Sequence, residues 1–194
     1  MNFVEDYFME VVDVCNRIDK RQLEEVVKGL IDLRENRGRL FILGVGGSAA
    51  NASHASNDFR KLAGIESYAP TDNVAEFTAR ANDEGWDSTF VGYLQASNLS
   101  KKDSLLILSV GGGDIEKNIS VNLCRAADYA KNVGCTIYAI SGRKEGYVQS
   151  LADIFVFVQI NVKDFITPLS ESFQALVWHL VVSHPELKLK PTKW

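Results

Sequence analysis

Apolar residues recur at intervals of three and four through the first part of the chain. They stand at Val11, Val14 and Ile18, and the same pattern continues from Leu23 to Leu33. This spacing places the apolar side chains on one face of a helix, while the acids and bases between them form a solvated face. The pattern therefore predicts one long amphipathic helical segment over residues 3–36.

Short apolar runs typical of buried strands occupy residues 39–44, 105–109, 136–140 and 154–160. Helical patterns follow at residues 49–62, 116–132 and 171–183. Strands that alternate with helices indicate a mainly parallel sheet covered on both faces. We therefore predict a single α/β domain over residues 1–194, a three-layer α/β/α sandwich. Its parallel, flavodoxin-like or Rossmann-like sheet is expected to have about five strands.

Composition narrows the class of protein. The net charge of -4 argues against a nucleic-acid binder, which usually carries a basic stripe. The longest apolar runs are too short to cross a bilayer, and the acidic N-terminus does not have the pattern of a signal peptide. Cys15, Cys124 and Cys135 each stand among apolar residues, so we expect buried free thiols and a cytoplasmic protein.

Two predicted strands end in glycine loops, LGVGGSAAN at residues 43–51 and SVGGGDIEKN at residues 109–118. Glycine lets backbone N–H groups turn inward, and a following helix presents the positive end of its dipole. Together these features bind anions, at the edge of a parallel sheet where ligands usually bind. We expect a phosphate between the two loops, each of which is predicted to open a helix. Alternatively, the glycines simply make tight turns.

A dinucleotide site is a competing interpretation of the first loop. Gly44, Gly46 and Ala49 match the G-x-G-x-x-A pattern, which is weak alone. The next candidate acid, Glu66, does not end an obvious second strand as a ribose-binding acid should. The chain also lacks the G-x-x-x-x-G-K-[ST] motif of P-loop nucleotidases. A nucleotide-binding oxidoreductase is therefore the weakest of the functions considered.

Several motifs resemble bacterial phosphoheptose isomerases, members of the SIS (sugar isomerase) domain superfamily. They are GVGGSAANASH at residues 44–54, NDEGW at residues 82–86, a strand ending at Ser109 before a glycine loop, and VWH at residues 177–179. The resemblance implies interconversion of sedoheptulose 7-phosphate and D-glycero-D-manno-heptose 7-phosphate. It also implies a divalent metal such as zinc and a homotetramer with active sites at subunit interfaces, built partly by residues 1–36.

The resemblance further implies roles by position. His54 matches a metal-binding histidine, Asp58 the carboxylate that is base and metal ligand, and His179 a second histidine that is acid/base and metal ligand. Glu171 stands where the family usually has glutamine, at a position assigned to metal and substrate. The other matched positions contact phosphate or sugar: Val45, Gly46, Gly47, Ser48, Asn82, Asp83, Ser109, Val110, Gly111 and Asp114.

The residue types fit this chemistry in part. His54 and Asp58 are neighbours on one helical face, a spacing that suits two ligands of Zn²⁺, although a plain surface pair has the same spacing. A carboxylate and a histidine are also suitable to move a proton between adjacent carbons. Glu171 and His179 are about 12 Å apart along a straight helix. One metal can bind both only if the start of the helix is bent. Alternatively, the two residues belong to different sites, or a subunit interface brings them to one site.

Three positions depart from the family. Val45 replaces an asparagine, Asp58 is one methylene shorter than glutamate, and the second loop keeps only the Ser109 hydroxyl because Gly111 and Asp114 replace serines. Asp114 is expected to repel a phosphate. The leading hypothesis is an aldose–ketose isomerase with Asp58 as base and His179 as acid. The alternative is a non-catalytic phosphosugar-binding module, which binds sugar phosphate without turnover.

Overall fold

Short parallel strands form the centre of the molecule, whose computed structural model describes residues 2–192; Met1 and residues 193–194, which the single-domain prediction includes, lie outside the described residues. The strands are β1 (Arg39–Leu43), β2 (Glu66–Tyr68), β3 (Ser104–Ser109), β4 (Thr136–Ser141) and β5 (Ile154–Phe157). The helices are α1 (Phe3–Arg17), α2 (Lys20–Glu35), α3 (Gly47–Ala63), α4 (Val74–Asp83), α5 (Thr89–Ala96), α6 (Val121–Val133), α7 (Tyr147–Leu151) and α8 (Ile166–Ser183).

The strand order is β2-β1-β3-β4-β5, and every described pair is parallel. This is the flavodoxin-like order, in which the connections leave β1 and β3 toward opposite faces. Ligands bind at that switch point because the two diverging connections leave a crevice. The fold class predicted from the sequence is confirmed, and both glycine loops follow the two strands at the switch point.

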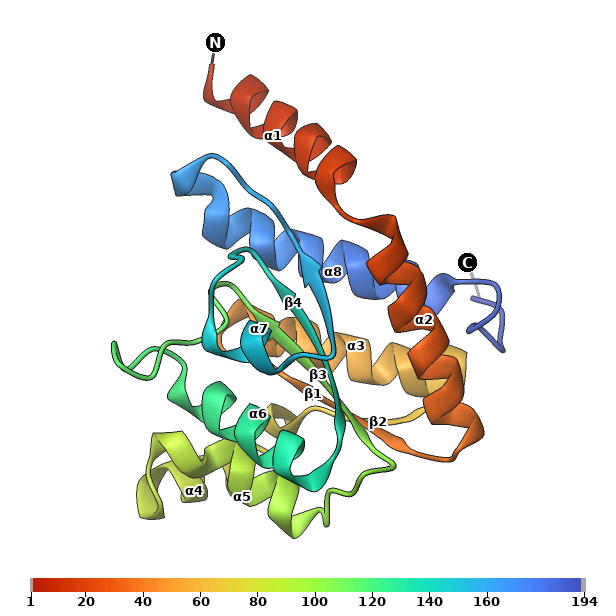
Figure 1. Ribbon diagram of the computed structural model, residues 1–194, viewed down its shortest axis with the longest axis vertical. Coiled ribbons are helices and arrows are strands. Elements are labelled where there is room, and N and C mark those ends of the chain that lie inside the picture. The colour runs from red at the N-terminus through yellow and green to blue at the C-terminus, as the bar shows by residue number, and fades with distance from the viewer. Residues whose placement is uncertain (1, 193–194) are drawn as a thin grey trace.

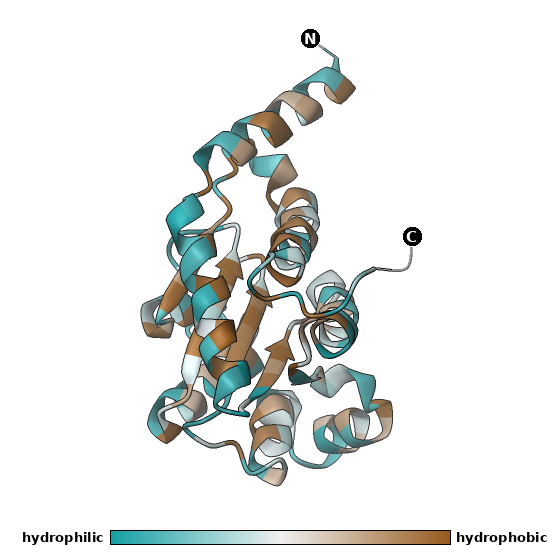
Figure 2. Ribbon diagram, turned by 90° about the vertical axis from the view of Figure 1, so that its right-hand side faces the viewer, coloured by the Kyte–Doolittle hydropathy of each residue, from teal (hydrophilic) through white to brown (hydrophobic). Residues whose placement is uncertain are grey.

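Alternate residues of the strands build separate cores on the two faces of the sheet. Leu40 and Ile42 pack with α2, α3 and α8, whereas Phe41 and Leu43 pack with α5, α6 and α7. Figure 1 shows α2 and α8 on one side of the strands and α5 and α6 on the other. Figure 2 shows the apolar strands enclosed between them. The three-layer arrangement follows from this pattern because each strand is buried on both faces.

The N-terminal segment forms two helices and not the one long helix that we predicted. The backbone leaves the helical conformation at Ile18, where ψ is 129°. Asp19 then caps α2, because its carboxylate accepts a hydrogen bond of 2.9 Å from the Arg21 N–H. The side chain of an N-cap aspartate satisfies a helix-end donor. As a result, α1 projects away from the sheet while α2 lies against it (Figure 1).

Several other boundaries differ from the predictions. The second glycine loop does not lead straight into a helix, because residues 114–119 turn back in an antiparallel bridge and α6 begins only at Val121. Helix α8 starts at Ile166, five residues before the predicted start, and β5 ends at Phe157. Strand β2 and helices α4, α5 and α7 carry no long apolar run that could predict them.

The three cysteines differ in their burial. Cys124 and Cys135 are buried free thiols as predicted, but Cys15 is exposed on α1. Burial raises the pKa of the Cys124 thiol to about 11 and that of Cys135 to about 12. Among the described residues, no helix has the length and apolar character needed to span a membrane.

Candidate functional site

A cavity of about 260 Å³ lies between the glycine loops that follow β1 and β3. The first loop contributes Val45 and Ser48, and the second contributes Ser109, Val110, Gly111 and Gly113. The remaining lining residues are Leu108, Ile119, Ser120, Leu123 and Arg143. The volume is below the range of about 300–1,000 Å³ typical of pockets for whole drug-sized ligands, so it suits one end of an elongated ligand.

The first loop presents the amino end of α3 to this cavity. Gly46 has a φ of 63° and precedes the helix, and no side chain of the described residues caps it. The first N–H groups of a helix lack intrahelical acceptors and carry the positive end of its dipole. Ser48, in the first turn, is buried and adds a hydroxyl at the cavity wall. This end of α3 can therefore bind an anion.

The second loop is shaped by its own hydrogen bonds. The Ser109 hydroxyl accepts a bond of 2.9 Å from the Gly112 N–H. Gly112 and Gly113 have φ values of 77° and 80°, which side-chain-bearing residues rarely adopt. Although α6 starts later than expected, its N-cap Ser120 lines the same cavity. The cavity is therefore bordered by the amino ends of both α3 and α6.

Asp114 is neutralised within its own turn. Its carboxylate accepts hydrogen bonds from the Lys117 N–H at 3.0 Å and from the Lys117 ammonium at 2.6 Å. These bonds hold the pKa of Asp114 below its usual range. The residue borders a neighbouring, larger cavity of about 1,030 Å³. The repulsion of a phosphate expected from this carboxylate is therefore offset by an adjacent cation.

A second cluster of functional groups joins α3 to α8. One ligand atom each from His54, Asp58 and His179 lies within 4.8 Å of the others, and His54 Nε2 is 3.8 Å from Asp58 Oδ2. His54 and Asp58 come together because they are one turn apart on α3, whereas His179 reaches them because α8 packs beside α3. Two imidazoles and a carboxylate are a donor set that suits zinc.

Trp178 packs against the imidazole rings of both His54 and His179. Its buried indole is stacked on the His179 ring with centroids 3.5 Å apart, and it meets the His54 ring at 4.7 Å. The Nδ1 atom of His179 lies 2.8 Å from the Ala175 carbonyl. A carbonyl partner requires a proton on Nδ1, so Nε2 is left to bind a metal or to exchange a proton.

Glu171 lies apart from this cluster. Helix α8 is already continuous at this residue, so the bent helix start that we considered for a shared metal is wrong. Its carboxylate lies against Gly47, where an added Cβ would collide with it. The Asn51 amide also donates a bond of 2.9 Å to the Glu171 carbonyl. The structure therefore places Glu171 at the first glycine loop.

The other predicted residues occupy more peripheral positions. Asn82 and Asp83 are exposed at the end of α4, where the Asn82 amide donates a bond of 2.7 Å to Asp83. Sequence reasoning missed Arg143, which lies on the wall of the cavity between the loops. Its position in the sequence could have indicated this role. A glycine–arginine pair directly follows β4 and thus lies at the ligand-binding edge of the sheet.

Comparisons with known proteins concern the family and the fold. A family model described as the SIS domain matches residues 6–142. A phosphoheptose isomerase from Syntrophotalea carbinolica is 28% identical, covering 91% of this chain and 89% of the relative. The lincomycin biosynthesis protein LmbN from Streptomyces lincolnensis is 33% identical, covering 80% of this chain and 58% of that protein. The solved phosphoheptose isomerase from Francisella tularensis superposes with a TM-score of 0.78 at 20% identity, covering 93% and 92% of the two chains.

Proposed function

Because this chain belongs to the SIS domain family, we propose that it interconverts sedoheptulose 7-phosphate and D-glycero-D-manno-heptose 7-phosphate. The observation that carries this proposal is the meeting of His54 and Asp58 on α3 with His179 on α8, because α3 begins at the cavity between the glycine loops. A carboxylate beside an imidazole provides the base and the acid that aldose–ketose isomerisation requires.

The cavity and the histidine cluster both lie along α3. Ser48 borders the cavity, and His54 follows six residues later, or about 9 Å along the helix axis. The proposed substrate therefore has its phosphate at the amino end of α3 and its first two carbons at the histidine cluster.

The chain's own residues then move one proton between those carbons. Asp58 removes a proton from C1 of the ketose, and the electron pair forms the double bond of a 1,2-enediol. His179, through Nε2, takes the proton of the C1 hydroxyl and delivers it to the oxygen on C2 as the carbonyl moves from C2 to C1, and Asp58 returns its proton to C2 to complete the aldose. Stacking on Trp178 and the bond to the Ala175 carbonyl hold the His179 ring in place for this transfer.

His54, Asp58 and His179 would hold a divalent metal, which we propose to be zinc. His54 is 59% exposed and Asp58 17% exposed, and the tautomer of His179 leaves its outer nitrogen either to coordinate the ion or, without it, to exchange a proton. When bound, such an ion polarises the carbonyl and hydroxyl oxygens of the substrate. His54→Gln is expected to lower the zinc content after dialysis, whereas His184→Gln, at the end of α8, is expected to retain it.

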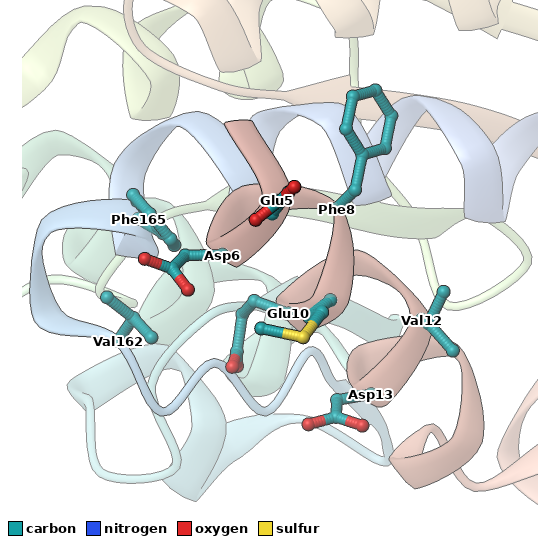
Figure 3. A pocket seen from close by; sticks show the side chains of 9 residues that line it. Glu5, Asp6, Phe8, Glu10, Val12, Asp13, Val162 and Phe165 are labelled. Carbon is teal, nitrogen blue, oxygen red and sulfur yellow. The ribbon is translucent and has the colours of Figure 1, made fainter. Parts of the chain in front are cut away.

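We also propose a homotetramer of single-domain subunits in the cytoplasm, with active sites at the subunit interfaces. Phe3, Phe8 and Val12 are 70%, 65% and 59% exposed on α1, and beside them lies a hollow of about 870 Å³. Figure 3 shows Phe8 and Val12 projecting outward from this helix. Leu176 and Leu180 are exposed around His179 as well. A neighbouring subunit that covers these faces would bury apolar surface and could bring Glu171 to a second site.

The test of the proposed function is turnover with exchange. The zinc-supplied protein is incubated with sedoheptulose 7-phosphate in D₂O, and proton NMR follows both the aldose product and deuterium incorporation at C2. Product formation with incorporation supports an isomerase. Tight binding of the sugar phosphate without either signal would instead support the phosphosugar-binding module, which the loss of hydroxyls from the second loop favours.

A further inference from the structure

Arg143 is the cationic side chain on the wall of the cavity between the two glycine loops. It follows β4, and its Cδ lies 3.9 Å from the position that a Cβ on Gly111 would occupy. The same residue also borders the adjoining larger cavity, together with Gly111, Gly113 and Ile119. Arg143 therefore lines both cavities.

The charges around the cavity leave Arg143 free to bind an anion. Lys117 is already engaged by Asp114, and Glu171 places a negative charge beside Gly47 on the first loop. The Arg143 guanidinium has no ion pair with any of residues 2–192. Because Glu171 lies beside the first loop and Glu116 and Glu145 line the adjoining cavity, a dianion requires an uncommitted cation, which Arg143 provides.

The loop that carries Arg143 is held against the second glycine loop by backbone hydrogen bonds. The Gly142 N–H donates to the Val110 carbonyl at 3.1 Å. Beyond Arg143, the N–H groups of Tyr147 and Val148 donate to the carbonyls of Gly113 and Gly112 at 3.1 and 2.9 Å. Two flanking attachments therefore fix where the side chain begins.

Gln149 strengthens this attachment from α7. Its amide donates bonds of 2.9 Å to the Ser141 hydroxyl and to the Arg143 carbonyl. Gly112 accommodates the same side chain, because a Cβ there would collide with the Gln149 amide. The backbone of Arg143 is thus positioned before a ligand arrives, which reduces the ordering needed on binding.

We propose that Arg143 binds the phosphate of the sugar substrate and replaces hydroxyls missing from the second loop. This inference rests on the proposed function, because it assigns the phosphate end of that substrate. Guanidinium groups bind phosphate oxygens through paired, charge-assisted hydrogen bonds. The amino ends of α3 and α6 bind the other oxygens. One arginine and backbone N–H groups therefore bind the phosphate in place of the missing hydroxyls.

The first test separates binding from chemistry in the full-length protein. Arg143→Gln is expected to raise KM for sedoheptulose 7-phosphate by about 10–100-fold, the size of a lost charged hydrogen bond, with kcat changed less than KM. The KM of Arg143→Lys is expected to lie between those of wild type and Arg143→Gln, because an ammonium keeps the charge but loses the paired geometry. Lys144→Gln removes the same charge from the next residue and is expected to leave KM unchanged.

The second test is independent of turnover. Calorimetry measures the Kd of sedoheptulose 7-phosphate and of unphosphorylated sedoheptulose for the same proteins, after circular dichroism has shown equal folding. The inference requires Arg143→Gln to lose affinity for the phosphorylated sugar only. A wild-type protein that binds the phosphorylated sugar without turning it over would refute the proposed isomerase but not the role of Arg143. Normal turnover and an unchanged Kd in Arg143→Gln would refute that role and leave the isomerase standing.

Discussion

At the scale of single residues, the proposed catalysis depends on the groups that surround His54, Asp58 and His179. The indole of Trp178 lies against both imidazoles, and the Ala175 carbonyl selects the tautomer of His179. Asp58 is only 17% exposed, whereas His54 is 59% exposed. The carboxylate is thus partly shielded from water while the histidine remains open to a ligand. This difference fits a base on Asp58 and a metal ligand on His54.

The catalytic assignment predicts a contrast among three variants. Asp58→Asn keeps nearly the same shape but removes the base, so turnover is expected to fall by about 10²–10⁴-fold. His179→Gln is expected to lose a similar factor. His184→Gln is the control, because His184 caps the end of α8 and lies 3.6 Å from Glu24. Steady-state kinetics on the three folded proteins is the measurement, and full turnover by Asp58→Asn would contradict the mechanism.

The buried hydroxyl of Ser48 predicts a smaller effect at the phosphate end. Ser48→Ala is expected to weaken sugar-phosphate binding by about 0.5–1.5 kcal/mol, because it removes one hydrogen bond. Ser56→Ala is a matched control, since Ser56 is also buried on α3 but its hydroxyl donates to the Ser53 carbonyl at 2.9 Å. Calorimetry that finds equal affinity for Ser48→Ala and wild type would count against this phosphate position.

At the scale of elements, a buried carboxylate joins β1 to the segment before β3. Asp103 is 3% exposed and accepts bonds from the Arg39 N–H at 2.9 Å and the Arg39 guanidinium at 2.8 Å. It also accepts from the Ser100 N–H at 2.9 Å. Burial raises the pKa of Asp103, but these hydrogen bonds outweigh burial and lower the pKa from its ordinary value of 3.8. We call these hydrogen bonds of Asp103 the clamp. It lies at the amino ends of β1 and β3, whereas the glycine loops follow their carboxyl ends.

This clamp predicts a pH-dependent loss of stability. Asp103→Asn is expected to lower the free energy of unfolding by about 1.5–3 kcal/mol at neutral pH. Because the folded pKa is lowered, the contribution of Asp103 is fully present above its unfolded pKa and disappears as pH falls through the folded value. Urea unfolding at several pH values measures it. A difference between variant and wild type that does not shrink below about pH 4 would contradict this account.

At the scale of the whole molecule, α1 is attached through its buried side and apolar along its exposed side. Arg17 donates a bond of 2.9 Å to the Gln159 carbonyl, and Glu10 accepts one of 2.7 Å from the Asn161 N–H. These bonds tie α1 to the segment after β5, while Phe8 and Val12 remain exposed. A tethered helix with an uncovered apolar side is a surface suited to a second copy of the chain.

The tetramer proposal predicts that a charge on α1 changes the assembly and not the fold. Val12→Asp is expected to shift the mass measured by light scattering to a smaller species at micromolar concentration, because a carboxylate would be buried without a partner. Val74→Asp is the matched control, since Val74 is 66% exposed on α4. A wild-type protein that is monomeric at this concentration would refute the tetramer.

Local patterns account for much of the fold and for part of the site. The alternation of strands and helices predicted the parallel sheet, and the glycine loops were placed correctly after β1 and β3. The His54–Asp58 pair was also predictable, because a spacing of four residues places both on one face of any helix. Hydrophobic periodicity and helix geometry act over a few residues, so they can be read from the chain directly.

Long-range packing decided the remainder. Residues 66–68 are a strand only because they pair with β1, since Glu66, Ser67 and Tyr68 form no apolar run. Their pairing puts Glu66 beside Arg39, at the opposite end of the sheet from the ligand-binding edge, which disfavours a dinucleotide site. His179 meets His54 because α8 packs on α3, and the same packing leaves Glu171 at Gly47.

The chain by itself therefore determined the alternation of strands and helices, the two glycine loops and the placing of Asp58 beside His54. Only the tertiary structure decided which distant groups share a cavity: Arg143 reaches the glycine loops because β3 and β4 are adjacent strands whose carboxyl ends meet. The physical reason is that local preferences fix the conformation within an element. Contacts between elements depend on which faces exclude water together, and many residues far apart in sequence determine this jointly.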